Sequence, residues 1–240
     1  MIRNLKIALL LLLAVACQEQ SKPTAEAVIL SGKITNYAGN SFSIINRHSV
    51  TQAVVTVDST GIFSDTLQLE EGFYRISAKN ESHKIYLRPG FQLQMNLDYA
   101  QYDETLSYQG EGAAPNNYLA QQYLLQEGFG NLTYYGYYAK LPEDEFLSLT
   151  DSLHQLELNL FSNAPIDDER FMIVEENNLK YALAVKIADY QGMRRFVTGD
   201  KSFNVSEDYP DGFEGFDPNQ ADLLIAPGYN SAVSKFVQKK

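Results

Sequence analysis

The chain has 240 residues, with 19 Lys and Arg against 30 Asp and Glu, so its formal net charge is −11. No block of basic residues occurs, which argues against nucleic acid or an anionic membrane surface as a partner. The chain contains one cysteine, so no internal disulfide can form, and no phosphate loop, Gly-x-Gly-x-x-Gly or other cofactor motif is recognisable.

The N-terminal residues have the pattern of a secretory signal peptide. Arg3 and Lys6 precede a short apolar run, Leu9–Leu13, which is followed by small residues and then by Cys17. The run is too short to span a bilayer, and positive charges before it are typical of export signals. A cysteine directly after the small residues predicts cleavage behind residues 1–16 and attachment of lipid to Cys17.

The predicted anchor places the protein in the cell envelope, with the membrane as its partner through lipid on Cys17. Several acyl chains would hold the protein firmly, and residues 17–26 are polar enough to form a tether. Gln18 rather than Asp follows the cysteine, which by analogy with enterobacterial sorting favours the outer membrane, on its periplasmic or its surface face. The alternative is that Cys17 is an ordinary residue near a conventional cleavage site, since Ala14 stands where Leu is usual.

Residues 27–109 alternate between apolar and polar side chains. In residues 91–97, for example, Phe91, Leu93, Met95 and Leu97 are apolar and the residues between them are polar. Turn signals recur at short intervals, at residues 37–40, 58–61, 70–72, 79–82 and 88–90. A period of two with such turns predicts seven or eight short antiparallel strands. We therefore expect a β-sandwich or open barrel as a domain over residues 27–110.

The period changes near Gly110-Glu111-Gly112, and residues 113–240 are expected to form a helical lobe, within a domain over 111–240. Three prolines stand where first helical turns accept them, and we expect helices to begin near Pro115, Pro142 and Pro165. The second helix has a stripe of apolar residues three and four apart, namely Phe146, Leu149, Leu153, Leu156 and Leu160. We expect the third to end near Gln191, an acidic loop over 199–220 and a last helix from about Ala221. Strands followed by helices predict the α+β class.

Several short segments, in this order, resemble one known family. They are Leu30–Asn36, Asp58–Phe63 with its D-x-x-G-x-F turn, Gly72–Ile76, Ile85–Gly90 and Gly110–Leu119. Behind a lipoprotein leader, they resemble the N-terminal region of Bacteroidota lipoproteins of the TlpA-like, thioredoxin-fold type. That region comprises a β-domain of unknown function (DUF4369-like) and a helical segment. The resemblance implies an envelope lipoprotein, and substrate selection and dimerisation are the roles usually suggested for this region.

The chain departs from that family in the part that carries its chemistry. Family members continue into a thioredoxin fold with Trp-Cys-x-x-Cys, whereas this chain has no Trp and its one Cys is the predicted lipid site. We therefore expect no enzyme activity here, but a non-catalytic binding or docking module. One alternative is a fragment, or a separated substrate-side half, of a thiol-disulfide oxidoreductase. Another is a glycan-binding lipoprotein, against which the absence of Trp argues mildly.

Most candidate sites have a simpler interpretation. His48, His83 and His154 each stand alone, without a partner at the spacing of zinc ligands, and the first two are expected at strand ends or turns. The acidic loop carries Glu207, Asp208, Asp211, Glu214, Asp217 and Asp222. These could offer calcium its oxygens, but they do not fit EF-hand spacing, so a solvated loop without metal is favoured.

A tyrosine cluster is the most ambiguous feature. Its members are Tyr134, Tyr135, Tyr137 and Tyr138. Consecutive tyrosines cannot all face one core, and rings with an apolar face and a polar tip suit interfaces. Packing between the two lobes is the favoured interpretation. The alternatives are an interface with a second copy or another envelope protein, and a platform for a ligand.

Overall fold

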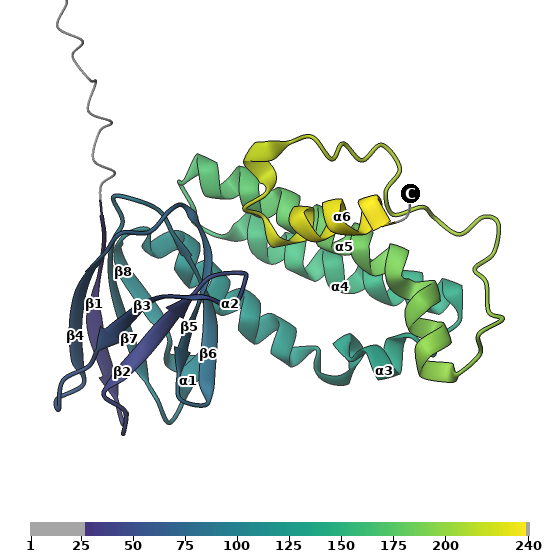
Figure 1. The fold of residues 1–240 in the computed structure, drawn as a ribbon. Helices are drawn as coiled ribbons and strands as arrows, with labels where there is room; N and C mark the ends of the chain where they lie inside the picture. Colours follow the sequence, from purple (N-terminus) through teal and green to yellow (C-terminus); the bar gives the residue numbers. More distant parts are fainter. Residues whose placement is uncertain (1–26, 239–240) are drawn as a thin grey trace, which may run out of the picture.

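The computed structural model describes residues 27–238, and these form a β-sandwich followed by a helical region (Figure 1). The α+β class expected from the sequence is confirmed. The signal peptide, the tether and Cys17 lie outside the described residues.

Eight strands form two four-stranded sheets. The strands are β1 (Val28–Thr35), β2 (Ser41–Ile45), β3 (Thr51–Thr56), β4 (Ile62–Leu67), β5 (Gly72–Ala78), β6 (Glu81–Leu87), β7 (Gln92–Asp98) and β8 (Ser107–Glu111), with the short helix α1 (Tyr102–Thr105) before β8. One sheet has the order β4-β1-β7-β8 and the other β3-β2-β5-β6, and they are not closed into a barrel. Buried residues alternate with exposed ones along β7, as the sequence predicted.

One strand pair differs from the expected antiparallel arrangement, because β1 and β7 run parallel. The whole second sheet lies between them in the chain, which supplies the long crossover that a parallel pair needs. Gly32 allows their close approach. A Cβ at this position would lie 1.7 Å from the carbonyl oxygen of Met95, and the φ of Gly32 is +149°. Only glycine fits this position.

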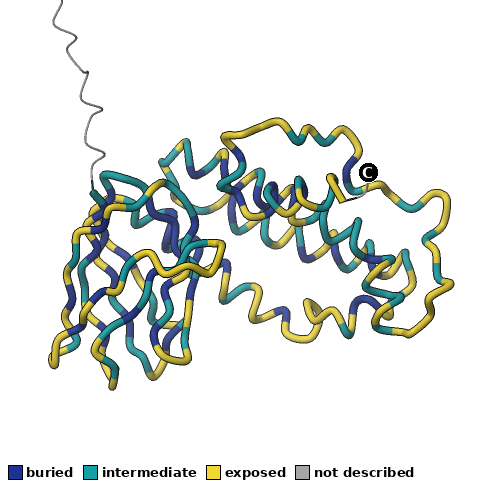
Figure 2. The backbone as a smooth tube through the Cα atoms, in the orientation of Figure 1, coloured by how far each residue is buried: buried dark blue, intermediate teal, exposed yellow. Residues whose placement is uncertain are grey.

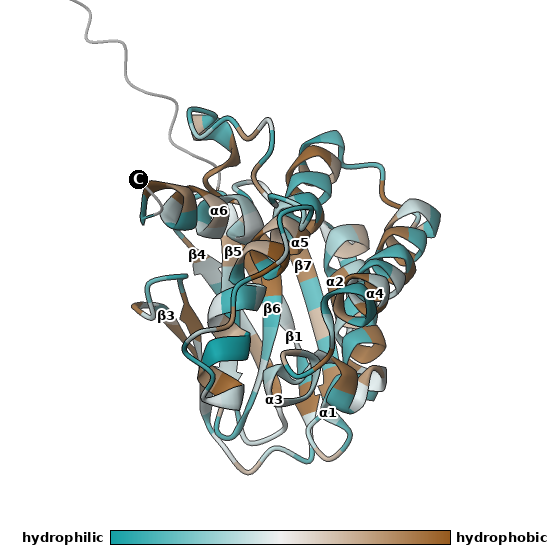
Figure 3. Ribbon diagram, turned by 90° about the vertical axis from the view of Figure 1, so that its right-hand side faces the viewer, coloured by the Kyte–Doolittle hydropathy of each residue, from teal (hydrophilic) through white to brown (hydrophobic). Residues whose placement is uncertain are grey.

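The helical region contains one short and four longer α-helices and two 3₁₀ turns. They are α2 (Ala113–Gly128), η1 (Gly130–Thr133), α3 (Tyr135–Tyr138), α4 (Glu143–Asn163), α5 (Glu169–Thr198), η2 (Ala221–Leu223) and α6 (Pro227–Gln238). Figure 3 shows these helices in front of the strands. The connection over residues 199–220 follows the surface and is mostly exposed (Figure 2). No helix within residues 27–238 combines the length and the apolar character that crossing a membrane requires.

Helix boundaries match the expectations in part. Pro142 is the N-cap of α4, as expected, but Pro165 lies before α5 and does not begin it. The N-cap of α5 is Asp168, whose carboxylate accepts a hydrogen bond from the N–H of Phe171 at 3.0 Å. A carboxylate satisfies an otherwise unpaired N–H of the first turn, which a proline cannot do. The third helix also runs beyond Gln191, and the last helix begins only at Pro227.

The first turn of α5 packs on the outer face of the sheet β3-β2-β5-β6. The ring of Phe171 lies 5.0 Å from that of Tyr86 and 6.2 Å from that of Phe73, measured between centroids. All three rings are buried or nearly so, which makes this aromatic contact the apolar centre of the junction. Aromatic pairs at such separations add about 0.5–1.5 kcal/mol beyond the burial of their area.

Two ion pairs flank the aromatic contact. Arg88, after β6, lies 3.0 Å from Asp168, and Arg170 lies 2.9 Å from Glu71 in the turn before β5. Glu71 also accepts a hydrogen bond from the hydroxyl of Tyr86. Each ion pair joins the sandwich to the first residues of α5, so the direction of this helix relative to the sheet is fixed at three points.

The junction can be tested at Asp168, which both caps α5 and pairs with Arg88. We expect Asp168→Ala to lower the free energy of unfolding by about 1–2 kcal/mol, because a helix cap and an ion pair are lost together. Urea denaturation followed by circular dichroism measures this. Asp167→Ala is the matched control, since Asp167 is an exposed neighbour of the same charge. An equal effect of the two substitutions would contradict the role assigned to Asp168.

Candidate functional site

A cleft lies between the sandwich and the helical region. It consists of two adjoining hollows of about 430 and 800 Å³. Residues that line both are Asn46, Arg47, Phe73, Tyr74 and Pro227. We call the two hollows together the inter-lobe cleft. The smaller hollow lies against strands β2, β5 and β6, and the larger one against η2, α6 and the turns around β2 and β5.

The sheet supplies the floor of the smaller hollow. Ile45 pairs in register with Arg75, and Arg75 pairs with Lys84 on the next strand. Residues directly opposite one another on antiparallel strands project to the same side. Phe73 is two residues from Arg75 and therefore lies on that side too. The floor thus combines apolar surface with two cationic side chains.

These cations have no carboxylate partner. Arg75 is exposed, and within residues 27–238 it makes no ion pair or side-chain hydrogen bond. Lys84 donates to the amide oxygen of Gln122 at 3.1 Å and lies 5.4 Å above the ring of Phe73. Arg47 donates to the carbonyl of Leu224, across the cleft. In a chain of net charge −11, this surface is a local concentration of positive charge.

Carboxylates border the cationic floor on two sides. Glu70 and Glu71 line the larger hollow, where Glu71 is paired with Arg170, and further carboxylates lie beyond Tyr123. The pKa of Asp103 is raised to about 6, first by burial and then by Glu127, Glu81 and Glu104. Asp103 also raises the pKa of Tyr123. The positive surface therefore ends at Tyr123, and the charge changes sign across this side chain. Such a change would orient a ligand that carries charge at one end.

A fully buried carboxylate lies behind the cleft. Glu175 on α5 has no exposed surface and accepts hydrogen bonds from the Tyr118 hydroxyl at 3.1 Å and from the side-chain amides of Gln122 at 2.9 Å and Asn178 at 3.0 Å. Neutral donors thus satisfy it, as a buried charge requires. Because Gln122 also accepts from Lys84, this network fixes the ammonium group over the sheet.

The sequence did not single out the residues of the inter-lobe cleft. The sequence does contain a weak sign of the cleft. Phe73 and Arg75 are two residues apart in a predicted strand, so they lie on the same face, and a cation beside an apolar residue is unusual on a buried face. The parity alone does not tell which side of the sheet the helices cover. The approach of Tyr123 and Pro227 to this face comes from long-range packing.

The structure separates the four members of the tyrosine cluster. Tyr138 is buried beside Phe146, at a centroid distance of 5.8 Å. The exposed fractions of Tyr134, Tyr135 and Tyr137 are 55%, 41% and 43%. Packing between the lobes therefore does not account for these three rings, which lie at the far end of α2 from the sandwich (Figure 1). That they form an interface stays a prediction.

The three histidines have different surroundings. His48 is exposed, His154 is half-buried on α4, and His83 is buried within β6 rather than at a strand end or turn. The Nδ1 of His83 lies 2.8 Å from the Tyr102 hydroxyl, and its Nε2 lies 2.7 Å from the Tyr108 hydroxyl. A neutral imidazole matches this pair, since it accepts from one hydroxyl and donates to the other. Burial lowers the pKa of His83 to about 3.

Carboxylates of the acidic loop stabilise its own turns. Asp211 accepts from the N–H of Phe213 at 3.1 Å, and Asp217 accepts from the N–H of Asn219 at 3.0 Å. In the part of the chain that the structure describes, no three His, Cys, Asp or Glu residues come together as metal ligands would. These observations assign the two carboxylates to local turn structure.

Comparison with known proteins yields little. No family model matches the chain, and no curated protein matches it. One solved structure, a DUF3823 family protein from Parabacteroides merdae, is 18% identical over 36% of this chain and 47% of its own length, with a TM-score of 0.22. The match thus spans less than half of that protein, and a likeness of this size supports no statement about fold or function.

His83 generates a prediction about acid stability. Its pKa is about 3 in the folded protein and 6.5 in a free side chain, so the unfolded chain binds the proton more readily. The contribution of His83 to the free energy of unfolding is therefore complete above pH 6.5 and is lost as the pH falls towards 3. In His83→Gln, we expect the dependence of this free energy on pH, between pH 6 and 4, to be shallower by about 1.4 kcal/mol per pH unit. Denaturant titrations at several pH values measure it. The exposed His48→Gln should leave the slope unchanged, and an equal slope in all three proteins would contradict the assignment.

Proposed function

We propose that the chain is a non-catalytic binding module of the cell envelope, tethered through lipid on Cys17. Its ligand carries an anionic group and an apolar portion and binds in the inter-lobe cleft. The observation that carries this proposal is the group of cations Arg47, Arg75 and Lys84 beside the apolar floor, without a carboxylate within 4.0 Å in the described chain.

The geometry supports binding in two ways. The apolar floor contributes about 25 cal/mol for each Å² of apolar surface that a ligand covers, and the cations fix the ligand's orientation. The floor is also rigid, because Phe73 packs against Phe171 and Lys84 is held by Gln122. A preorganised surface loses little conformational entropy when it binds.

A probe with a sulfonate and apolar rings, 1-anilinonaphthalene-8-sulfonate, tests the cleft. We expect native protein to enhance its fluorescence on binding. The double substitution Arg75→Gln and Lys84→Gln should weaken binding about tenfold, because two charge-assisted contacts of the sulfonate are lost. N-phenyl-1-naphthylamine has similar rings without the sulfonate, and its affinity should stay within about twofold between wild type and variant.

The matched control is the double substitution Lys33→Gln and Lys201→Gln, which removes the same charge from exposed positions outside the cleft. It should leave the affinity for both probes close to that of wild type at physiological ionic strength, because exposed charges beyond a Debye length are screened. If the control lowers sulfonate binding as much as the cleft variant does, net charge and not the cleft is responsible.

The anchor has its own test, independent of the cleft. The protein purified from its native host should have a mass that includes diacylglycerol and an acyl group on a chain beginning at Cys17. Cys17→Ser should abolish lipidation and move the protein from the membrane fraction to the soluble fraction. A wild-type chain cut elsewhere, or bearing no lipid, would contradict the anchor while leaving the cleft proposal in place.

A further inference from the structure

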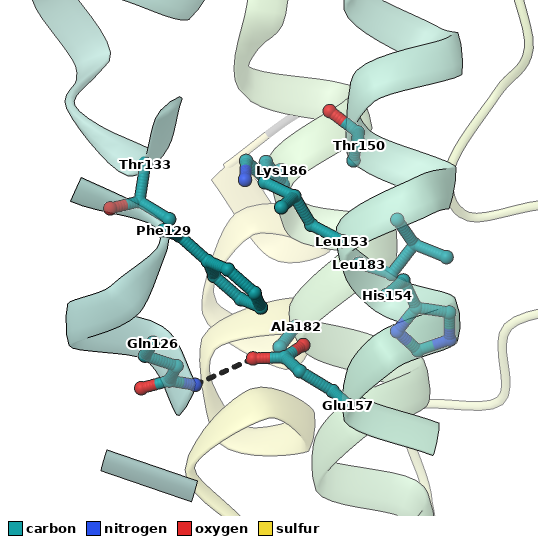
Figure 4. A pocket seen from close by; sticks show the side chains of 10 residues that line it. All are labelled: Gln126, Phe129, Thr133, Thr150, Leu153, His154, Glu157, Ala182, Leu183 and Lys186. Atoms are coloured by element: carbon teal, nitrogen blue, oxygen red, sulfur yellow. Dashed lines mark hydrogen bonds between the residues drawn. The ribbon is translucent and has the colours of Figure 1, made fainter. Parts of the chain in front are cut away.

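A second cavity lies inside the helical region, away from the inter-lobe cleft. It has a volume of about 290 Å³, is lined by the end of α2 with η1, by α4 and by α5, and is open to solvent on one side, where Gln126, Thr133 and Ala182 are exposed (Figure 4). Its residues take no part in the proposed function. The volume is near the lower limit for ligand pockets, so an occupant would be small.

One end of the cavity holds a lysine without an ion pair. Lys186 on α5 is half-buried, and its ammonium lies 5.0 Å above the ring of Tyr138. No carboxylate lies within 4.0 Å of it among residues 27–238. Burial lowers the pKa of Lys186, and Glu157 opposes this effect from a distance. An anionic group placed at this end would compensate the lysine's lost hydration.

Thr150 is a second and independent sign of a missing partner. Its side chain on α4 is only 3% exposed, and its hydroxyl oxygen has no hydrogen-bond partner in the described structure. A hydroxyl that is buried without a partner destabilises the folded protein, because it has lost its hydrogen bonds to water. Figure 4 shows Thr150 and Lys186 at the same end of the cavity. A ligand oxygen at this end would accept from Lys186, and also from Thr150 once rotation about χ1 brings its covered hydroxyl to the cavity wall.

The other end of the cavity carries a carboxylate. Glu157 lies seven residues after Thr150 on α4, which is about 10.5 Å along a helix axis. It accepts one hydrogen bond, at 2.6 Å, from the amide of Gln126 on α2. A carboxylate has about four acceptor positions, so Glu157 retains capacity for a donor inside the cavity. Figure 4 shows Glu157 and Gln126 together at this end.

Apolar side chains form the walls between the two ends. Phe129 is only 9% exposed and its ring points into the cavity, opposite Leu153 on α4 (Figure 4). Leu183 and Ala182 on α5 complete the apolar part of the lining. The cavity is therefore polarised, with a cation and a hydroxyl at one end and a carboxylate at the other. Its wall is mainly apolar, and Thr133 and His154 add polar groups to it.

We propose that this cavity binds a small zwitterion of the amino-acid class with an apolar side chain. Its carboxylate lies at Lys186 and Thr150, its ammonium lies towards Glu157, and its side chain contacts Phe129. Each charged group of such a molecule meets its opposite, and the unpaired Thr150 hydroxyl gains an acceptor.

Three probes of one carbon skeleton separate the parts of this proposal. They are L-leucine, 4-methylpentanoate, which lacks the ammonium, and 3-methylbutylamine, which lacks the carboxylate. Isothermal titration should show leucine bound to the wild-type protein at least tenfold more tightly than either analogue, because each analogue leaves one charged group of the cavity unpaired.

Substitutions then assign the contacts. Lys186→Gln and Glu157→Gln should each weaken leucine binding about tenfold or more. Lys180→Gln is the matched control, because Lys180 lies on the same helix and over a tyrosine ring, at 5.2 Å, but does not line this cavity. Thr150→Val keeps the shape and removes the hydroxyl. It should weaken binding severalfold while leaving the unliganded protein equally stable or more stable, because the unpaired buried hydroxyl is gone.

The result that would overturn the proposal is the absence of leucine binding at 10 mM. Equal affinity for leucine and 4-methylpentanoate would also overturn it, because the ammonium would then have no role. A loss of binding in Lys180→Gln equal to that in Lys186→Gln would exclude this cavity as the site. None of these titrations uses the sulfonate probe, so the proposal for the cavity and the proposal for the inter-lobe cleft are tested separately.

Discussion

The docking of α5 on the outer face of one sheet determines the rest of this architecture. Phe171 packs against the adjacent rings of Phe73 and Tyr86, and the ion pairs Arg88–Asp168 and Arg170–Glu71 flank this contact. The apolar contact supplies most of the stabilisation, since ion pairs that are partly exposed contribute only about 0–1 kcal/mol each. Their role is geometric, because they set the direction in which a thirty-residue helix leaves the sheet. The inter-lobe cleft exists because this helix covers only part of that face.

The polar groups of the interior divide into those with partners and those without. His83 is satisfied by two tyrosine hydroxyls, and Glu175 by a hydroxyl and two amides. These groups stabilise the fold and offer nothing to a ligand. Thr150 in the helical cavity has no such partner in the described structure. Because an unsatisfied polar group is costly when buried, Thr150 marks a place where a ligand would gain most. Arg75 in the cleft also lacks a partner, but it is exposed to solvent, so its contribution there is its charge.

Local sequence patterns predicted the strands and most helices, because each depends on neighbours in the chain. Alternation along β7 and Pro142 before α4 are examples. The start of α5 was misplaced because Pro165 and Asp168 both suit a first turn, and the capping carboxylate decides between them. The parallel pairing of β1 and β7 and the cleft were not predictable in this way. Both arise from contacts between residues far apart in sequence, as between Lys84 and Gln122.

The most direct test of the central claim is to map the sulfonate probe on the protein by ¹⁵N amide chemical shifts. The account predicts that perturbations concentrate on β5 and β6 around Arg75 and Lys84, on the β2–β3 turn and on α2 near Tyr123. These shift changes should all saturate with the same dissociation constant as the probe is added. Perturbations confined to the exposed tyrosines at residues 134–137, or spread evenly over the surface without saturation, would contradict a binding site in the inter-lobe cleft.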